Sequence, residues 1–438
     1  MILRVGRIWA LAINTDKIVW IFVIPFGITM MQFTFLQKEG VPSWLNIGSI
    51  TAGIVFMTLL MRTKRYRNPI PLLIASVMIS QSILVGLFVL LTESFPIEIS
   101  EMMKSYFQAI FCAGIIVVAC YANLPSMNVY VKSINNLSWL GAIHGILLLS
   151  QLILVNIFAI DILVNPFGSF AKYGPFCVPY EQMPWDPFFR PNGFFSEPSA
   201  AAWFSSYTLA FSILGYMKFN TSFIPIIFCS IGCLATASGS GIVNLVVLSM
   251  CSIFFLNENR SSSFAISVMT TKACFLLLTC TVAIVVVNNR FDEFSTETSS
   301  LYLRVIAPAR ILAESIQNSP FGITLGDERF VIDSGLNDTN KEFQKAQSNS
   351  SSSNGAIQNG LLRIAIYWGV SGVILLALMA SWTAREVKRG NVFILPVVAS
   401  VLCGAETGAI WIPSFGLLAA FAAIGFRSSE LITSSQEN

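Results

Sequence analysis

The chain has 438 residues, of which 55% are hydrophobic and only 11% are charged, and its formal net charge at pH 7 is +3. Soluble globular domains carry about 25% charged residues, so this composition indicates an integral membrane protein and excludes a water-soluble domain. No nucleic-acid partner is expected.

Apolar segments of membrane-spanning length recur from end to end of the chain. A bilayer core about 30 Å thick requires roughly 20 apolar residues per helix. This length predicts an all-α integral membrane protein with about twelve transmembrane helices in one polytopic domain, 1–438. A break at Ser238–Gly241 separates the seventh span from the eighth. The predicted spans are 18–36, 44–61, 70–92, 105–122, 138–160, 199–217, 222–237, 240–256, 268–287, 360–382, 391–405 and 413–426.

Polar side chains inside these spans are few. The single histidine, His144, lies in the middle of the fifth span, and a lone intramembrane histidine is a candidate site residue. No second histidine or carboxylate lies on the same predicted helix, which favours a packed, hydrogen-bonded role. Gln81, Gln151 and Asn244 are interpreted as hydrogen-bonding contacts between helices.

Two long polar loops, 161–197 and 288–358, interrupt the apolar pattern. Cytoplasmic loops of membrane proteins are enriched in Lys and Arg. If the N-terminus is inside and the spans alternate, the inside segments hold 15 of the 26 Lys and Arg residues but only five of the 23 Asp and Glu residues. The Arg62–Arg67 and Arg385–Arg389 clusters carry most of this bias. Both termini are therefore expected in the cytoplasm and both large loops outside.

The first loop ends in a segment that carries candidate catalytic residues. Arg190-Pro-Asn-Gly193-Phe-Phe-Ser-Glu197-Pro198 leads directly into the sixth span. Arg190 is expected at the membrane surface, where its guanidinium either grips a substrate phosphate or snorkels to lipid phosphate. Glu197 is either a carboxylate favoured by the start of a helix or a general base for a sugar hydroxyl. Gly193 permits a turn, and Pro198 suits the first position of a helix.

The second loop contains a helical pattern and two further arginines of interest. Apolar residues keep helical spacing over 299–317, which predicts a helix lying on the membrane or on the other loop, disturbed at Pro308. Arg310 lies four residues before Glu314, so these two side chains can pair. Arg304 has no acidic residue three or four positions away and is the more interesting cation.

Nucleotide and metal motifs are absent from the sequence. It has no GxxxxGK[ST] loop, no strand-linked GxGxxG and no Cys/His cluster with the spacing of metal ligands. No cofactor and no metal are therefore expected. Any chemistry must run on an already activated, membrane-borne substrate or on an ion gradient.

Four short motifs follow one another over 185–375. They are Arg190-x-x-Gly193-x-x-x-x-Pro198, Thr236-Ala-Ser-Gly-Ser-Gly, Arg304 with Pro320-x-Gly322-x-x-x-Gly326, and Asn359-Gly-Leu-Leu continuing to Gly369-Val-Ser-Gly372. In this order and topology the chain resembles the O-antigen polymerase and ligase superfamily of bacterial envelope glycosyltransferases. Ligases of that superfamily usually carry a His just before the span that here begins near Leu361. This chain has Gln358 and Asn359 instead, which favours the polymerase.

The resemblance implies a C-type glycosyltransferase-like helical fold in the bacterial inner membrane, with two large periplasmic loops and no metal. It implies that undecaprenyl-diphosphate-linked oligosaccharide repeat units are polymerised into O-antigen or a related surface polysaccharide by block transfer on the periplasmic face. Membrane lipid, a separate chain-length regulator and a flippase are the implied partners. The alternatives are an O-antigen ligase that joins polymer to lipid A–core, and a lipid-linked oligosaccharide flippase or transporter.

The leaving group of this reaction defines the candidate site. Negative charge grows on the diphosphate as the bond to the sugar breaks, and preorganised cations stabilise that charge. Arg190 and Arg304 are therefore the predicted catalytic cations, and Glu197 is the candidate base. The predicted substrate-binding residues are Arg310, Gly193, Gln358 and Asn359.

Overall fold

The computed structural model describes residues 17–30, 47–63, 69–91, 99–158, 190–193, 195, 198–255, 305–323, 325, 359–406 and 413–436. Within these ranges every regular element is a helix, and the one extended pairing is an isolated bridge between Thr63 and Ala122. The prediction of an all-α protein is therefore confirmed for the described part of the chain.

The helical elements run in the following order along the chain. They are η1 (Val19–Val23), α2 (Ile24–Thr29), α3 (Ile47–Leu60), α4 (Ile70–Leu91), α5 (Ile99–Tyr121), α6 (Met127–Asn156), α7 (Pro198–Phe219), α8 (Ile224–Ala235), α9 (Gly239–Phe255), α12 (Ala307–Asn318), α15 (Gly360–Lys388), η5 (Val392–Ile394), α16 (Leu395–Glu406) and α17 (Pro413–Gln436).

Several of these helices are long and apolar enough to cross a membrane. In the described ranges four qualify by length and composition: Ile70–Phe88, Met102–Tyr121, Met127–Asn156 and Gly360–Lys388. Further apolar helices of 10–17 residues accompany them. An integral membrane protein is therefore supported, whereas twelve full-length spans are not established. The predicted span 268–287 lies outside the described residues.

Two predicted boundaries meet different outcomes in the structure. The fifth span was expected over 138–160, but α6 begins at Met127. Its first turns carry Asn, Lys and Ser side chains, which an apolar window leaves out although they form regular helix. The predicted break near Ser238–Gly241 is confirmed, since α8 ends at Ala235 and α9 begins at Gly239.

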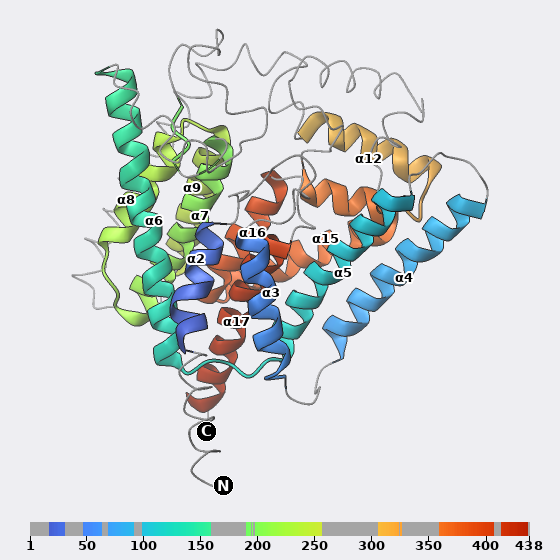
Figure 1. Ribbon diagram of the computed structural model, residues 1–438, viewed down its shortest axis with the longest axis horizontal. Coiled ribbons are helices and arrows are strands. Elements are labelled where there is room, and N and C mark those ends of the chain that lie inside the picture. The colour runs from blue at the N-terminus through green and yellow to red at the C-terminus, as the bar shows by residue number, and fades with distance from the viewer. Residues whose placement is uncertain are drawn as a thin grey trace.

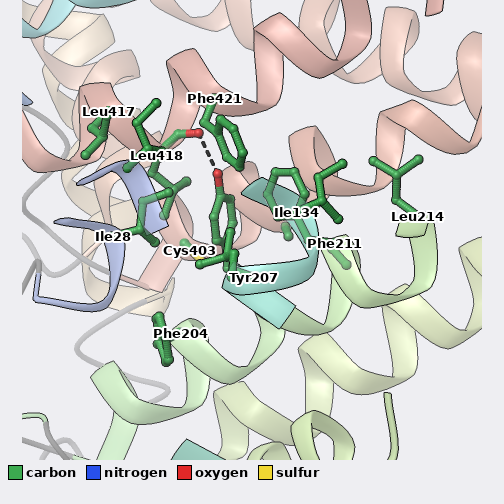
Figure 2. Packing of buried hydrophobic residues seen from close by; sticks show 14 of the residues in the cluster. Ile28, Ile134, Phe204, Tyr207, Phe211, Leu214, Cys403, Leu417, Leu418 and Phe421 are labelled. Carbon is green, nitrogen blue, oxygen red and sulfur yellow. Dashed lines mark hydrogen bonds between the residues drawn. The ribbon is translucent and has the colours of Figure 1, made fainter. Parts of the chain in front are cut away.

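Helix α7 forms the centre of the molecule. Its residues are buried without interruption from Ala200 to Ser212, as expected for a helix enclosed on all sides. Helices α6, α8, α9 and α16 pack around it. Figure 2 shows how α17 completes this core: the Tyr207 hydroxyl donates to the Leu418 carbonyl at 2.7 Å. The ring of Phe211 stacks on that of Phe421, on α17, with centroids 5.0 Å apart.

One face of helix α4 presents apolar side chains to its surroundings. Leu73, Leu84 and Phe88 are 60%, 67% and 67% exposed. Such a continuous apolar surface is costly in water, and lipid is the solvent that it fits. The exposed apolar face of α4 therefore indicates a surface that contacts lipid.

The two ends of the helical body differ in what they carry. In Figure 1, α12 and the C-terminal end of α6 lie at one end, and the C-terminal part of α17 lies at the other. We call the first of these the loop end. At the opposite end, the Arg427 guanidinium donates to the carbonyls of Ala119 and Ala122 at 2.8 and 2.9 Å. The carbonyl of Arg62 accepts from the backbone of Asn123 nearby.

A second, smaller hydrophobic core lies beneath α12. It joins α12 to α4, α5 and α15 through residues that include Met78, Tyr106, Ile311 and Ile366. The predicted helix 299–317 is thus confirmed over Ala307–Asn318, and the helical geometry changes close to Pro308, since residues 305–306 just before α12 are π-helical. Pro308 lies in the first turn of α12, where a proline is tolerated because its missing N–H has no partner within the α-helix.

Candidate functional site

The residues around Gly193 make a tight turn at the loop end. The backbone N–H of Phe195 donates to the Asn192 carbonyl at 2.9 Å. The Asn192 side-chain amide donates to the Phe195 carbonyl at 2.8 Å. Gly193 has a φ of 59°, in the left-handed region that residues with a β-carbon rarely adopt. The prediction that Gly193 forms a turn is confirmed.

A buried socket on α6 and α7 holds this turn. The backbone N–H of Gly193 donates to Gln151 Oε1 at 2.8 Å. A β-carbon added to Gly193 would overlap Nε2 of His144 and would lie 2.7 Å from its Cδ2. Phe195 is fully buried, with its ring 5.1 Å from that of His144 and 5.1 Å from that of Phe204. We call Gln151, His144 and Phe204 the socket.

His144 is fixed within the socket by polar and aromatic neighbours. Its Nδ1 lies 3.4 Å from the hydroxyl of Ser205 on α7. The rings of Phe195 and Phe204 meet the imidazole edge-on, at interplanar angles of 85° and 79°. His144 is fully buried, as the packed interpretation predicted. What the sequence did not reveal is that it packs under the first loop.

Gln151 plays a different part from the one predicted. A contact between helices was expected, but its oxygen accepts from the backbone of the first loop. The two residues are 42 positions apart, so no local pattern links them. The socket therefore fixes the backbone three residues after Arg190, a partly buried side chain at the loop end of the molecule.

The remaining residues of the first motif are only partly described. Pro198 begins α7, as predicted. Glu197, the candidate base, lies outside the described residues, and so do Arg304 and Gln358. Their predicted roles remain predictions.

The second loop contributes α12 and the turn that follows it. Arg310 lies on α12 and is exposed. After α12, the N–H of Gly322 donates to the Ser319 carbonyl at 2.8 Å, which closes a turn at Pro320–Gly322. The N–H of Val370, on α15, donates to the Pro320 carbonyl at 3.0 Å. Two motifs that are widely separated in sequence therefore meet in space.

Asn359 stands at the start of α15. It is buried, and its Oδ1 accepts from the backbone N–H of Leu362 at 3.0 Å. This is an N-cap hydrogen bond, which satisfies one of the donors left open at a helix start. The first role that the structure gives Asn359 is therefore helix capping, whereas substrate binding was predicted.

Arg363, one turn into α15, is a cation that the sequence reasoning missed. It is half-buried, and its guanidinium carbon lies 5.9 Å from the centroid of the Tyr367 ring. Its helix packs against α12, which carries Arg310. A cation in the first turn meets the positive end of the helix dipole, and this unfavourable placement was the available signal.

The described residues offer no obvious place for a metal ion. Across the ranges that the structure describes, no group of three or more His, Cys, Asp or Glu side chains gathers. Arg190, Arg310 and Arg363 are described residues whose guanidinium groups can stabilise negative charge.

Fold and site together define a helical membrane protein with arginine-bearing segments anchored at one end. The chain belongs to the WcaD colanic acid polymerase family, which matches residues 28–427. The match includes both long polar loops and confirms the resemblance to bacterial polysaccharide polymerases. Family membership thus implies a polymerase of the glycosyltransferase type. No curated protein sequence matches the chain at a significant level.

Proposed function

We propose that the protein polymerises oligosaccharide repeat units linked to undecaprenyl diphosphate, at the periplasmic face of the bacterial inner membrane. The family supports polymerisation, and its name makes a colanic-acid-type surface polysaccharide the first product to test. O-antigen is the alternative product of the same chemistry. A chain-length regulator and a flippase are the proposed partners.

The reaction is a glycosyl transfer between two lipid-linked chains. A hydroxyl at the non-reducing end of one repeat unit attacks the anomeric carbon of the sugar that joins the other chain to its diphosphate. The new glycosidic bond forms as the sugar–phosphate bond breaks, and the diphosphate leaves with the bonding electrons. The hydroxyl proton passes to a base, for which Glu197 is our candidate.

The observation that carries the proposal is the anchored turn before α7. Cations stabilise a transition state best when they are already oriented, because no reorganisation is then needed during the reaction. Gly193 is held by the socket, so the backbone that carries Arg190 is fixed at the loop end. Loss of one such donor typically costs about 100- to 1,000-fold in rate. We assign Arg190 to the departing diphosphate, together with Arg304.

The two ends of the molecule support the proposed orientation. The anchored turn and α12 lie at the loop end, whereas Arg62 and Arg427 belong to the other end. Basic residues are enriched on the cytoplasmic side of membrane proteins. The loop end is therefore proposed to face the periplasm, where lipid-linked repeat units are joined, and both termini to lie in the cytoplasm.

Deletion and complementation test the function. A strain that lacks the gene is expected to lose long polysaccharide chains while single repeat units still reach their acceptor. Plasmid-borne Arg190→Ala should leave this defect uncorrected, and Arg190→Lys should restore it only in part because lysine cannot bind phosphate bidentately. Loss of every attached chain would instead indicate a ligase, and cytoplasmic accumulation of lipid-linked repeats would indicate a flippase. Either pattern overturns the proposal.

A further inference from the structure

Helix α15 is broken at Gly369. This residue has φ 55° and ψ −134°, which is not helical and which only glycine adopts easily. A β-carbon here would overlap the Pro320 carbonyl oxygen and lie 2.6 Å from the Gly322 nitrogen. The break therefore lies where the turn at Pro320–Gly322 packs against α15. It separates an N-terminal arm, Gly360–Trp368, from the rest of the helix.

One side chain on α4 bridges the break with hydrogen bonds. The Nε2 group of Gln81 donates to the Phe321 carbonyl at 2.8 Å and to the Trp368 carbonyl at 3.1 Å. Its Oε1 accepts from the Ser371 hydroxyl at 2.7 Å. The amide thus bonds to the turn and to both sides of the break. We call Gln81, its three partners and Gly369 the clasp.

A second contact ties the arm to the same helix. The indole N–H of Trp368 donates to the Met78 carbonyl at 2.8 Å, one turn before Gln81. Trp368 is 6% exposed and belongs to the small core that includes Ile311 of α12 and Ile366 of the arm. The arm is therefore held to α4 by hydrogen bonds and to α12 by apolar packing.

Broken helices are rare in membranes for a physical reason. Backbone groups in hydrocarbon must be satisfied internally, so non-helical backbone is tolerated only where protein buries it or a cavity requires it. In this helix, whose 29 residues are long and apolar enough to span a membrane, the clasp supplies the missing partners. Strained backbone of this kind concentrates at functional sites, where it fixes a geometry that a straight helix does not provide.

The arm and α12 both carry arginine. Arg363 lies in the first turn of the arm, stacked over Tyr367, and Arg310 lies on α12. A straight continuation of α15 would send the arm in a different direction and separate it from α12. The break and its clasp therefore set how these two arginines lie relative to each other.

We propose that Gln81 is a positioning residue for polymerisation, and that its clasp holds the arm of α15 and α12 in the placement that lets Arg363 and Arg310 bind one substrate diphosphate. This inference rests on the proposed function, because the diphosphate is the ligand that it names. Gln81 itself touches only protein.

The test uses full-length protein in proteoliposomes, with the lipid-linked repeat unit as substrate. Gln81→Leu leaves the Phe321 carbonyl without this donor and the Trp368 carbonyl with only the Ser371 hydroxyl, and it is expected to lower kcat/KM at least tenfold. Ser371→Ala retains both donations from Gln81 and should lower kcat/KM less than Gln81→Leu does. Ser381→Ala is the matched control, since this exposed hydroxyl bonds only to a carbonyl of its own helix turn.

A covalent staple separates positioning from folding. Phe321 belongs to the clasp and Val370 lies beside it, and the Val370 N–H donates to the carbonyl of Pro320, the residue before Phe321, so the two backbones run close together. Both side chains are exposed, so cysteines are introduced at the two positions, and the disulfide is verified on a non-reducing gel before rates are compared. In the Gln81→Leu background the closed disulfide should restore at least half of the wild-type rate, and each single cysteine variant should restore none. In the wild-type background the disulfide should leave polymerisation intact.

Distinct outcomes overturn distinct claims. A wild-type rate for Gln81→Leu, or a staple that fails to restore a folded Gln81→Leu protein, refutes the positioning role. If Gln81→Leu does not accumulate in membranes, the positioning role is tested with the disulfide-linked protein that retains Gln81. Loss of its activity on disulfide closure would show that the clasp must open, which contradicts the inference. Absence of polymer from the wild-type protein refutes the proposed function instead.

Discussion

Replacement of Gly193 by alanine is the sharpest test of the socket. An alanine in the left-handed region costs about 1–2 kcal/mol relative to glycine. In addition, its β-carbon would overlap the imidazole of His144, which has little room because Phe195 and Phe204 meet it edge-on. The turn must therefore lift out of the socket and carry Arg190 with it.

The expected loss of activity follows from that displacement. A shift of about 1 Å in a catalytic group can cost about 100-fold in rate, so Gly193→Ala is expected to lower the polymerisation rate about 100-fold. The amount of folded protein in the membrane is measured alongside the rate, because a few kcal/mol is a sizeable part of a typical net folding stability of about 5–15 kcal/mol. The assay is the initial rate of polymer formation per unit of membrane-inserted protein.

Two companion variants make this prediction refutable. Gly239→Ala is the matched control, since nothing lies within 4 Å of a β-carbon at that position. The double variant Gly193→Ala/His144→Ala removes the overlap and leaves only backbone strain of about 1–2 kcal/mol, so it should recover to within about 30-fold of His144→Ala alone. If Gly193→Ala matches Gly239→Ala, or if the double variant is no better than Gly193→Ala, the socket does not position Arg190.

Three further changes have separate expected outcomes. Gln151→Leu removes the acceptor of the Gly193 N–H, which should cost about 1–3 kcal/mol and most of the polymerisation activity. Gln151→Glu keeps an acceptor oxygen and should retain more activity than Gln151→Leu. Equal polymerisation rates for the two variants would contradict the anchoring role of Gln151. Asn359→Ala removes the cap of α15 and should lower the free energy of unfolding by about 0.5–2 kcal/mol with kcat unchanged. Thermal melts and rates on the same sample measure both quantities. A lower kcat at normal stability would show that Asn359 acts on the substrate instead. Arg310→Ala should raise KM for the lipid-linked substrate, and an unchanged saturation curve would remove it from the site.

Much of the local structure could be predicted because it depends on residues close in sequence. Pro198 starts α7 because proline suits the first position of a helix. Small residues near Ser238 end one helix and start the next. Pro308 was predicted to disturb the helix over 299–317, and regular α-helix begins beside it, after π-helical residues 305–306. Proline breaks a helix from within and begins one at its first turn, and only the structure shows where α12 begins.

The anchoring of the loops could not be predicted in this way. Gln151 was expected to join two helices, yet its partner Gly193 lies in a loop 42 residues away. Gln81 joins α4 to α15, as predicted, but it also donates to the Phe321 carbonyl, 240 positions away in the second loop. Hydropathy identifies both glutamines only as polar residues in apolar spans. Which backbone each one satisfies is decided by tertiary packing, and those contacts hold the described parts of both candidate loops in place.

The most direct test of the central claim is reconstitution of the purified protein with a lipid-linked repeat unit in liposomes that contain no other protein. The wild-type protein is predicted to produce a ladder of products that lengthen by whole repeat units, and the same amount of Arg190→Ala should produce less than about 1% as much, as expected for the loss of an oriented donor. A wild-type sample that leaves an intact substrate unlengthened, or an Arg190→Ala ladder equal to the wild type, would contradict the account.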